Sequence, residues 1–347
     1  MALGDVVVRT VDLFCGGGLS SWGAQAAGAQ IVAGVDAWDR ATATFRRNFP
    51  KALVRTCRLS MDSGPEILGR DIGSVELLIA SPECTNHSIA KGNKPRDEDS
   101  QRSGSFAVEF LRKMGKTAPR WVVLENVAPW RHWSGYSDLI GGLEELGYHY
   151  ETLILDATNF GVPQSRKRLF VICDREGKPR LPTKGPTTSL TARDILCDDP
   201  TWKEGPLYTP TRSPNTLARA EAGIDALGKG VDFLVVYYGS DKAGGWQALD
   251  RPLRTLATLD RFGLVRWRDG EPTLRMLQVP ELVRAMGLLH RKPARGPSVP
   301  FRFSDSCSRR EMVKIVGNGV CAPVMEAIVK SLTTTACARD LPRSLAA

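Results

Sequence analysis

The sequence predicts an α/β protein in which a parallel or mostly parallel sheet with flanking helices is followed by a smaller second domain. Its 347 residues suffice for about two domains. The first half alternates short apolar runs with segments of helical length, and near Asp174 the chain becomes rich in Pro, Gly, Thr and charged residues. Continuous apolar runs suit strands that helices cover on both faces, which favours the parallel arrangement.

Seven runs rich in β-branched residues are the predicted strands of this sheet. In chain order they are Val6–Val11, Ile31–Val35, Ala52–Arg55, Val75–Ala80, Trp121–Leu124, Thr152–Leu155 and Leu169–Ile172.

The second domain is predicted from turns and a single strand. Between residues 175 and 249 there are turns such as Gly205-Pro206, and Asp232–Tyr238 is the one clear strand. From Arg310 to Leu332 the apolar residues have amphipathic helical spacing, and we expect this segment to fold back on the sheet. The predicted boundaries are therefore 1–175, 176–300 and 301–335.

Composition and charge exclude several classes of protein. With 42% hydrophobic and 24% charged residues the chain is of the folded, globular type, and a net charge of +9 indicates an anionic partner. No apolar run approaches the ~18 residues that span a bilayer, and the start lacks a secretory signal, so we expect an intracellular protein. The eight cysteines lie far apart, which argues against a disulfide framework and a structural zinc site.

A glycine turn follows the first predicted strand. In Asp12–Gly18 the glycines allow the backbone to approach a ligand, and Asp36, at the end of the second strand, can accept hydrogen bonds from ribose hydroxyls. Because Ser21 stands where the dinucleotide fingerprint has its third Gly, the pattern favours a cofactor with one nucleoside over NAD. A turn required only for packing is the alternative interpretation.

Reactive side chains follow three further strands. Cys84 comes just past one strand, after the stiff Pro82, and Glu125 ends the next, so a thiol and a carboxyl group can converge on one pocket. A lone cysteine is otherwise a small buried apolar residue. Gln164, Arg166 and Arg168 alternate with period two, which predicts three donors on one side of an extended segment. A solvated charge run would not require the glutamine.

These motifs occur in an order that resembles the DNA (cytosine-5)-methyltransferases of bacteria and phages, over nearly the whole chain. The glycine turn resembles the family's D-L-F-x-G-x-G motif, and Asp36 resembles its second motif. The nucleophile loop, the Glu-Asn-Val, the Gln-x-Arg-x-Arg and the last conserved blocks of the family are matched by Ser81–Ser88, Glu125–Val127, Gln164–Arg168, Arg251–Leu256, Leu274–Leu277 and Gly317–Val320.

The resemblance implies a Rossmann-like, S-adenosylmethionine-dependent methyltransferase domain in residues 1–175. It further implies a smaller, mixed DNA-recognition domain in 176–300 and a C-terminal helical segment, 301–335, that returns to the catalytic domain. The implied cofactor is S-adenosylmethionine and the implied partner is double-stranded DNA, without a metal or a membrane. We expect a monomer in the cytoplasm, associated with the nucleoid, and a role in restriction and modification.

The resemblance also assigns residues to the site. The catalytic residues it implies are Cys84, Glu125, Gln164, Arg166 and Arg168. The cofactor-binding residues it implies are Asp12, Phe14, Gly16, Gly18, Asp36, Ala37, Pro82 and Asn318, the last of these near the methionine end of the cofactor.

The implied chemistry assigns a task to each reactive group. Cys84 attacks C6 of a flipped-out cytosine while Glu125, in its acid form, donates to N3, so we predict that burial raises the pKa of Glu125. Arg168 and Arg166 are expected to hold the base oxygen and the neighbouring phosphate. The segment Thr85–Gly104 is expected to close over the base, and residues 251–310, with 13 Arg and Lys against 5 Asp and Glu, to follow the DNA backbone.

Two positions depart from the family pattern. The family has Pro directly before the nucleophile, where this chain has Glu83, whose carboxylate raises the pKa of the thiol unless it points away. The Asp that in the family meets the adenine amino group is matched by Arg58, with Asp62 as a displaced candidate.

Three alternative functions remain open. A tRNA-modifying relative would share the catalytic motifs. A non-catalytic DNA-binding relative is disfavoured because all five predicted catalytic residues are present. A nicotinamide-dependent oxidoreductase would use the glycine turn but would leave Cys84, Glu125 and the arginines without a role.

Overall fold

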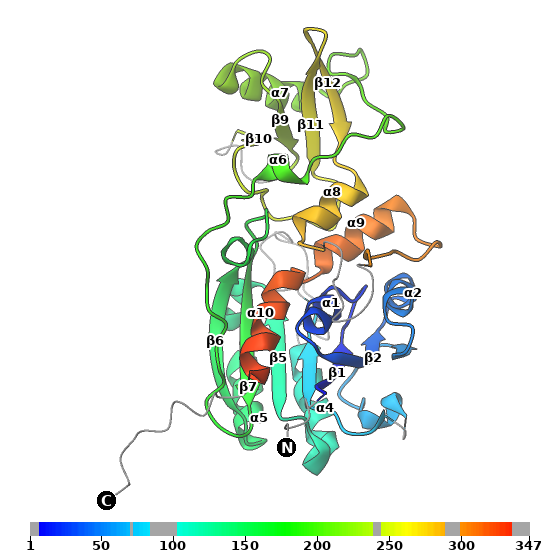
Figure 1. Cartoon of the computed structure of the whole chain (residues 1–347), viewed down its shortest axis with the longest axis vertical. Helices are drawn as coiled ribbons and strands as arrows, with labels where there is room; N and C mark the ends of the chain where they lie inside the picture. The colour runs from blue at the N-terminus through cyan, green and yellow to red at the C-terminus, as the bar shows by residue number, and fades with distance from the viewer. Residues whose placement is uncertain (1–6, 70–71, 84–102, 239–243, 289–298, 335–347) are drawn as a thin grey trace, which may run out of the picture.

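The first half of the chain forms a seven-stranded sheet of order β3-β2-β1-β4-β5-β7-β6. The structure, a computed structural model, describes residues 7–69, 72–83, 103–238, 244–288 and 299–334 (Figure 1). Each predicted strand coincides with an observed one. The strands are β1 (Arg9–Leu13), β2 (Gln30–Asp36), β3 (Leu53–Thr56), β4 (Leu77–Ala80), β5 (Trp121–Asn126), β6 (His149–Asp156) and β7 (Lys167–Asp174).

Strand direction makes this sheet mostly parallel, as predicted. β1 to β5 pair parallel to one another, whereas β7 is inserted antiparallel between β5 and β6. The register pairs Asn126 at the end of β5 with Leu169 near the start of β7. The first residues of β7 therefore lie at the same edge of the sheet as the carboxyl ends of the parallel strands.

Helices cover both faces of the sheet. On β4, Leu77 and Ile79 belong to the core beneath α1 and α10, while Leu78 and Ala80 belong to the core beneath α4 and α5, as the strand period of two requires. The helices of this part are α1 (Leu19–Ala26), α2 (Asp39–Asn48), α4 (Ser103–Met114), α5 (Tyr136–Glu145), α9 (Arg309–Asn318) and α10 (Ala322–Thr333), with 3-10 turns η1 (Pro65–Leu68), η4 (Gly115–Thr117), η5 (Ala128–His132) and η6 (Ala157–Phe160).

A second, antiparallel sheet stands at one end of the molecule (Figure 1). Its order is β10-β9-β11-β12-β8, and α7 packs on it around a separate small core that contains Phe233, Val235 and Val265. The helices and strands of this part of the chain are α6 (Ala192–Ile195), β8 (Gly205–Pro206), α7 (Pro214–Leu227), β9 (Phe233–Val236), β10 (Trp246–Ala248), β11 (Phe262–Arg268), β12 (Glu271–Met276) and α8 (Val279–Ala285).

The sequence predicted β9 but not the hairpin of β11 and β12, which lies in the stretch noted for its basic charge and for two blocks that resemble the family. A local signal for it exists, because Asp269 and Gly270 both have positive φ between the two strands. An Asp-Gly pair of this kind is a strong indication of a tight hairpin.

The C-terminal segment folds back on the sheet as expected, but as two helices. α9 ends at Asn318, and α10 packs closely against α1, since a Cβ on Gly23 would lie 2.2 Å from the carbonyl oxygen of Ala322. The segment Arg309–Thr333 has the length and composition of a membrane span. However, 61% of its most apolar stretch is buried inside the protein. This burial, and the break between the helices, are typical of a core segment.

The contact of α1 with α10 depends on the missing side chain of Gly23. We expect Gly23→Ala to lower the free energy of unfolding by about 1–3 kcal/mol, because the two helices must separate to admit a methyl group. Urea unfolding measures this change. In the matched control, Gly141→Ala, the added Cβ on α5 has no heavy atom within 4 Å, so we expect unchanged or increased stability. Equal losses in both variants would contradict the close-packing argument.

Candidate active site

The carboxyl ends of the parallel strands surround a cavity of about 320 Å³. Its wall combines the β1–α1 turn, the ends of β2, β4 and β5, the start of β7 and the junction of α9 with α10. Of the predicted site residues in the described part of the chain, those that line it are Phe14, Gly16, Asp36, Ala37, Pro82, Glu125, Arg166, Arg168 and Asn318.

The glycine turn serves both packing and the cavity. Gly16 has φ +52° and a Cβ there would meet no heavy atom within 4 Å, whereas a Cβ on Gly18 would lie 2.6 Å from the ring of Phe49. Asp12 and Gly18 are absent from the described cavity wall. The structure thus places these two residues outside the described wall, and direct cofactor contact by them stays a prediction.

Asp36 holds the turn to the end of β2. Its carboxylate accepts hydrogen bonds from the backbone N–H groups of Gly16 and Trp38, each at 2.8 Å. Burial raises the pKa of Asp36 despite these bonds. The carboxylate thus lies between the glycine turn and Trp38, whose ring also carries the Lys314 ammonium group 4.3 Å from its centroid.

Asp12 is a fully buried carboxyl group behind the turn. Its Oδ2 accepts a hydrogen bond of 2.6 Å from the Ser21 hydroxyl, and its Oδ1 has no hydrogen-bond partner among the described residues. Burial and, less strongly, the nearby charge of Asp36 raise the pKa of Asp12, and the hydrogen bond from Ser21 opposes them, so that the pKa is raised to about 7. Asp12 therefore changes charge near neutral pH.

Glu125 and Arg168 form a buried ion pair at the deep end of the cavity. The Arg168 Nε lies 3.3 Å from Glu125 Oε1, and Glu125 is 6% exposed. Burial raises the pKa of Glu125, while the charges of Arg168 and Arg166 oppose this shift without cancelling it. The predicted direction of the shift is confirmed, and Glu125 holds a proton more readily than an exposed glutamate does.

The predicted nucleophile lies outside the described residues. Cys84 and the segment expected to close over the base, up to residue 102, belong to that part of the chain. The strand that leads to Cys84 does end at the cavity, where Pro82 and Glu83 line the wall and the Pro82 carbonyl accepts a bond of 3.2 Å from the Asn126 amide.

Of the three alternating donors, Gln164 does not reach the described cavity wall. Gln164 is fully buried and outside the described cavity wall, since its amide donates to the Ala285 carbonyl at 2.9 Å and accepts from the Leu256 N–H at 2.8 Å. Arg166 lines the cavity, but its guanidinium donates to the carbonyls of Leu256, Gly317 and Gly319. Of the three, Arg168 is the donor that pairs with the acid.

The two departures from the family pattern border a small hollow beside the cavity. Glu83 and Arg58 both line this hollow of about 20 Å³, together with Phe14 and Asp36. Asp62 is exposed and absent from it, and its N–H bonds to the Ser60 hydroxyl. Arg58, and not the displaced candidate Asp62, therefore lies beside the cavity.

The basic excess between residues 251 and 310 is partly used inside the protein. Arg275 is buried and its guanidinium is 2.7 Å from the Glu281 carboxylate, while Arg266 pairs with Asp198. These two arginines cannot follow a DNA backbone. The backbone contacts predicted for residues 251–310 are therefore expected from the exposed basic residues of this stretch, which include Arg251.

Several cavity residues were not predicted as site residues, and three of them have polar or aromatic side chains of interest. Ser20, Trp38 and Lys314 also line the wall. Trp38 could have been found from its position two residues after Asp36, whereas nothing in the amphipathic pattern of α9 marks Lys314. Among the described residues, no group of three His, Cys, Asp or Glu side chains could hold a metal ion.

Comparison with known proteins identifies the family. The sequence model of the C-5 cytosine-specific DNA methylase family matches residues 8–334. The chain belongs to this family. It is 34% identical over 194 residues to the Type II methyltransferase M.HgiDI of Herpetosiphon aurantiacus (54% of this chain, 61% of the relative) and 29% identical over 212 residues to M.AgeI of Thalassovita gelatinovora (58% and 48%). The chain thus spans about half to three fifths of the length of these relatives.

The fold is also that of solved methyltransferase structures. A mutant of Spodoptera frugiperda DNMT2 superposes with a TM-score of 0.67 at 16% identity, over 94% of this chain and 99% of the other. This likeness confirms the Rossmann-like methyltransferase fold with its mixed sheet.

The proton on Asp12 gives folding stability a pH dependence. Because its pKa is raised in the folded state, the unfolded chain binds fewer protons between pH 4 and 7, and stability falls there by about 1.4 kcal/mol per pH unit. We expect Asp12→Asn to remove this part of the dependence, as measured by urea unfolding at pH 5 and pH 7. Asp62→Asn, at an exposed position, is the control. The same pH dependence in wild type and Asp12→Asn would contradict the argument.

Proposed function

We propose that this protein transfers a methyl group from S-adenosylmethionine to C5 of a flipped-out cytosine in double-stranded DNA. The observation that carries the proposal is that one cavity holds both a nucleoside-binding end, at Gly16 and Asp36, and a buried acid paired with a guanidinium, Glu125 and Arg168. Family membership supports methyl transfer to cytosine C5, and the Type II methyltransferases among the relatives support a protective role in restriction and modification.

The cofactor fits the chemistry of the cavity wall. Asp36 and the open backbone at Gly16 would hold a ribose, and Phe14 and Trp38 offer aromatic surface beside it. Asn318, with Glu125 in the same wall, would stand toward the methyl-donating end. When bound, S-adenosylmethionine supplies an electrophilic methyl group without a metal.

The protein's own groups activate the cytosine. The Cys84 thiolate adds to C6, and the negative charge that develops at N3 is met by the proton of Glu125. C5 then becomes the nucleophile that would take the methyl group, with cleavage of the sulfur–methyl bond of the donor and release of S-adenosylhomocysteine. A base finally removes the C5 proton, the bond to Cys84 breaks, and the double bond returns.

Arg168 has two tasks in this scheme. Its guanidinium orients the Glu125 carboxyl group, and its remaining N–H groups can donate to the base oxygen. The pair also explains how Glu125 remains an acid in a buried site, because burial favours the protonated form while Arg168 stabilises the carboxylate formed after proton transfer.

Methyl transfer to DNA is the direct test. We expect labelled S-adenosylmethionine to transfer its methyl group to duplex DNA and not to tRNA, and bisulfite sequencing of DNA from expressing cells to show a defined methylated site. Cys84→Ala is expected to abolish transfer, because the variant lacks the thiol that forms the bond to C6. Transfer to tRNA alone, or transfer to DNA that persists in Cys84→Ala, would contradict the proposal.

The acid form of Glu125 predicts a specific kinetic change. We expect Glu125→Gln to lower kcat by about 10²–10⁴-fold, because an amide can donate a hydrogen bond to N3 but cannot release a proton. In the wild type, kcat should fall as pH rises through the pKa of Glu125, and this alkaline limb should be absent from the variant. Glu145→Gln, at an exposed position of α5, is the control. An unchanged alkaline limb in Glu125→Gln would assign it to another group.

A further inference from the structure

The Arg166 guanidinium lies where three separate parts of the chain meet. Arg166 directly precedes β7 and is 2% exposed. Its Nη1 donates to the Leu256 carbonyl at 3.0 Å, and its Nη2 donates to the carbonyls of Gly317 and Gly319 at 2.8 and 2.9 Å. A planar guanidinium can hold several acceptors in a fixed relative position, so these bonds define how the parts are placed.

The first of the parts held by Arg166 is a wall of the cofactor cavity. Gly317 and Gly319 flank Asn318, and all three line the cavity at the junction of α9 with α10. Two of the three carbonyls that Arg166 holds therefore belong to the residues on either side of Asn318. Movement of this turn would move Asn318 relative to the rest of the wall.

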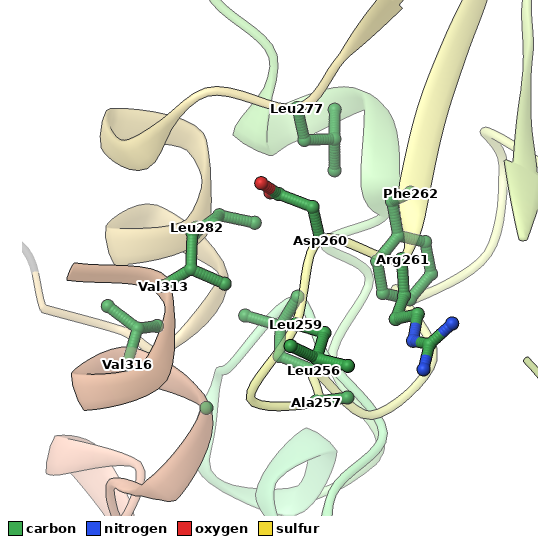
Figure 2. Close-up of a pocket in the computed structure, with 11 residues that line it drawn as sticks. Leu256, Ala257, Leu259, Asp260, Arg261, Phe262, Leu277, Leu282, Val313 and Val316 are labelled. Carbon is green, nitrogen blue, oxygen red and sulfur yellow. The ribbon is translucent and has the colours of Figure 1, made fainter. Parts of the chain in front are cut away.

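The second part is the connector that leads to the second sheet. Leu256 lies six residues before β11, and the backbone here approaches α9 so closely that a Cβ on Gly317 would lie 2.2 Å from the Ala257 carbonyl oxygen. Figure 2 shows this joint, with Leu256 and Ala257 on the connector facing Val316 and Val313 of α9. The connector cannot shift toward α9 without displacing the turn that carries Asn318.

A second tie joins the same elements nearer the surface. Asp260 of the connector pairs with Arg309 at the first turn of α9 at 2.8 Å, and Arg309 also donates to the Leu277 carbonyl just after β12. The chain entering β11 and the chain leaving β12 are therefore both attached to α9. This helix in turn places Lys314 and Asn318 in the cavity wall.

We propose that Arg166 is a positioning residue that couples the second sheet to the cofactor cavity. The inference rests on the proposed function, in which the cavity holds the cofactor, and on the expectation that residues 176–300, which include the second sheet, contact DNA. DNA that moves or fixes the second sheet also moves or fixes the connector and α9. Because Arg166 bonds to both the connector and the residues beside Asn318, the position of Asn318 changes with that of the connector. Because coupling between two binding sites is reciprocal, cofactor binding and DNA binding should strengthen each other.

The affinity for the product cofactor, S-adenosylhomocysteine, tests this coupling. Its Kd is measured by calorimetry with and without a duplex carrying the site that bisulfite sequencing identifies. In the wild type we expect DNA to tighten binding by at least about fivefold, within the usual range of such coupling. Arg166→Lys retains the positive charge near Glu125 but loses the planar fork, so we expect DNA to change the Kd by less than about twofold.

Two further variants separate coupling from general destabilisation. Arg120→Lys alters a half-exposed ion pair with Asp174, apart from the joint, and should retain the wild-type ratio of the two Kd values. Asp260→Asn removes only the outer tie, so we expect a Kd without DNA equal to that of the wild type and a reduced response to DNA. This variant decides the question if Arg166→Lys does not fold.

Each outcome has a separate meaning. A wild-type protein that does not bind S-adenosylhomocysteine contradicts the proposed function itself. Binding that DNA does not change in the wild type, or a wild-type ratio in both Arg166→Lys and Asp260→Asn, overturns the coupling while the proposed function stands. An equal loss in Arg120→Lys overturns it as well, because the effect would then follow from stability alone.

Discussion

The antiparallel insertion of β7 beside β5 is the constraint on which the site depends. Parallel strands bring only their carboxyl ends to this edge, and Glu125 arrives there at the end of β5. Because β7 runs in the opposite direction, its first residues reach the same edge and place Arg168 against Glu125. An acid and its counter-ion thus meet in the interior without a long loop to carry either of them.

Burial sets the protonation of the carboxyl groups around the cavity. Asp12, Asp36 and Glu125 each have a raised pKa, and burial is the first cause in every case. The three carboxyl groups differ in the groups that contact them. Asp36 is bonded to two backbone N–H groups, Asp12 to one hydroxyl, and Glu125 to a guanidinium. The same physical effect therefore acts on a buried acid behind the glycine turn, on Asp36 at the turn itself and on an acid paired with Arg168 in the cavity wall.

Glutamine and arginine side chains join the two sheets by bonding to backbone carbonyl and N–H groups. Gln164 holds Leu256 and Ala285, and Arg166 holds Leu256 together with the α9–α10 turn. Such bonds satisfy polar backbone groups that are buried where the chain passes between layers without regular structure. The cavity and the second sheet consequently share the same supporting hydrogen bonds, and neither is built independently of the other.

The sequence by itself determined the strands of the first sheet, the glycine turn with Asp36 after β2, and the acid at the end of β5. These follow from local periodicity and from the rule that parallel strands present their ends at one edge. Tertiary structure decided that Gln164 lies outside the described cavity wall and that Arg168, rather than Arg166, pairs with Glu125. Alternation places all three on one side of the chain, but Leu256, Ala285 and Gly317, which lie 90 or more residues away, supply the backbone groups that occupy the first two. No local pattern can reveal a partner that only the folded chain brings near.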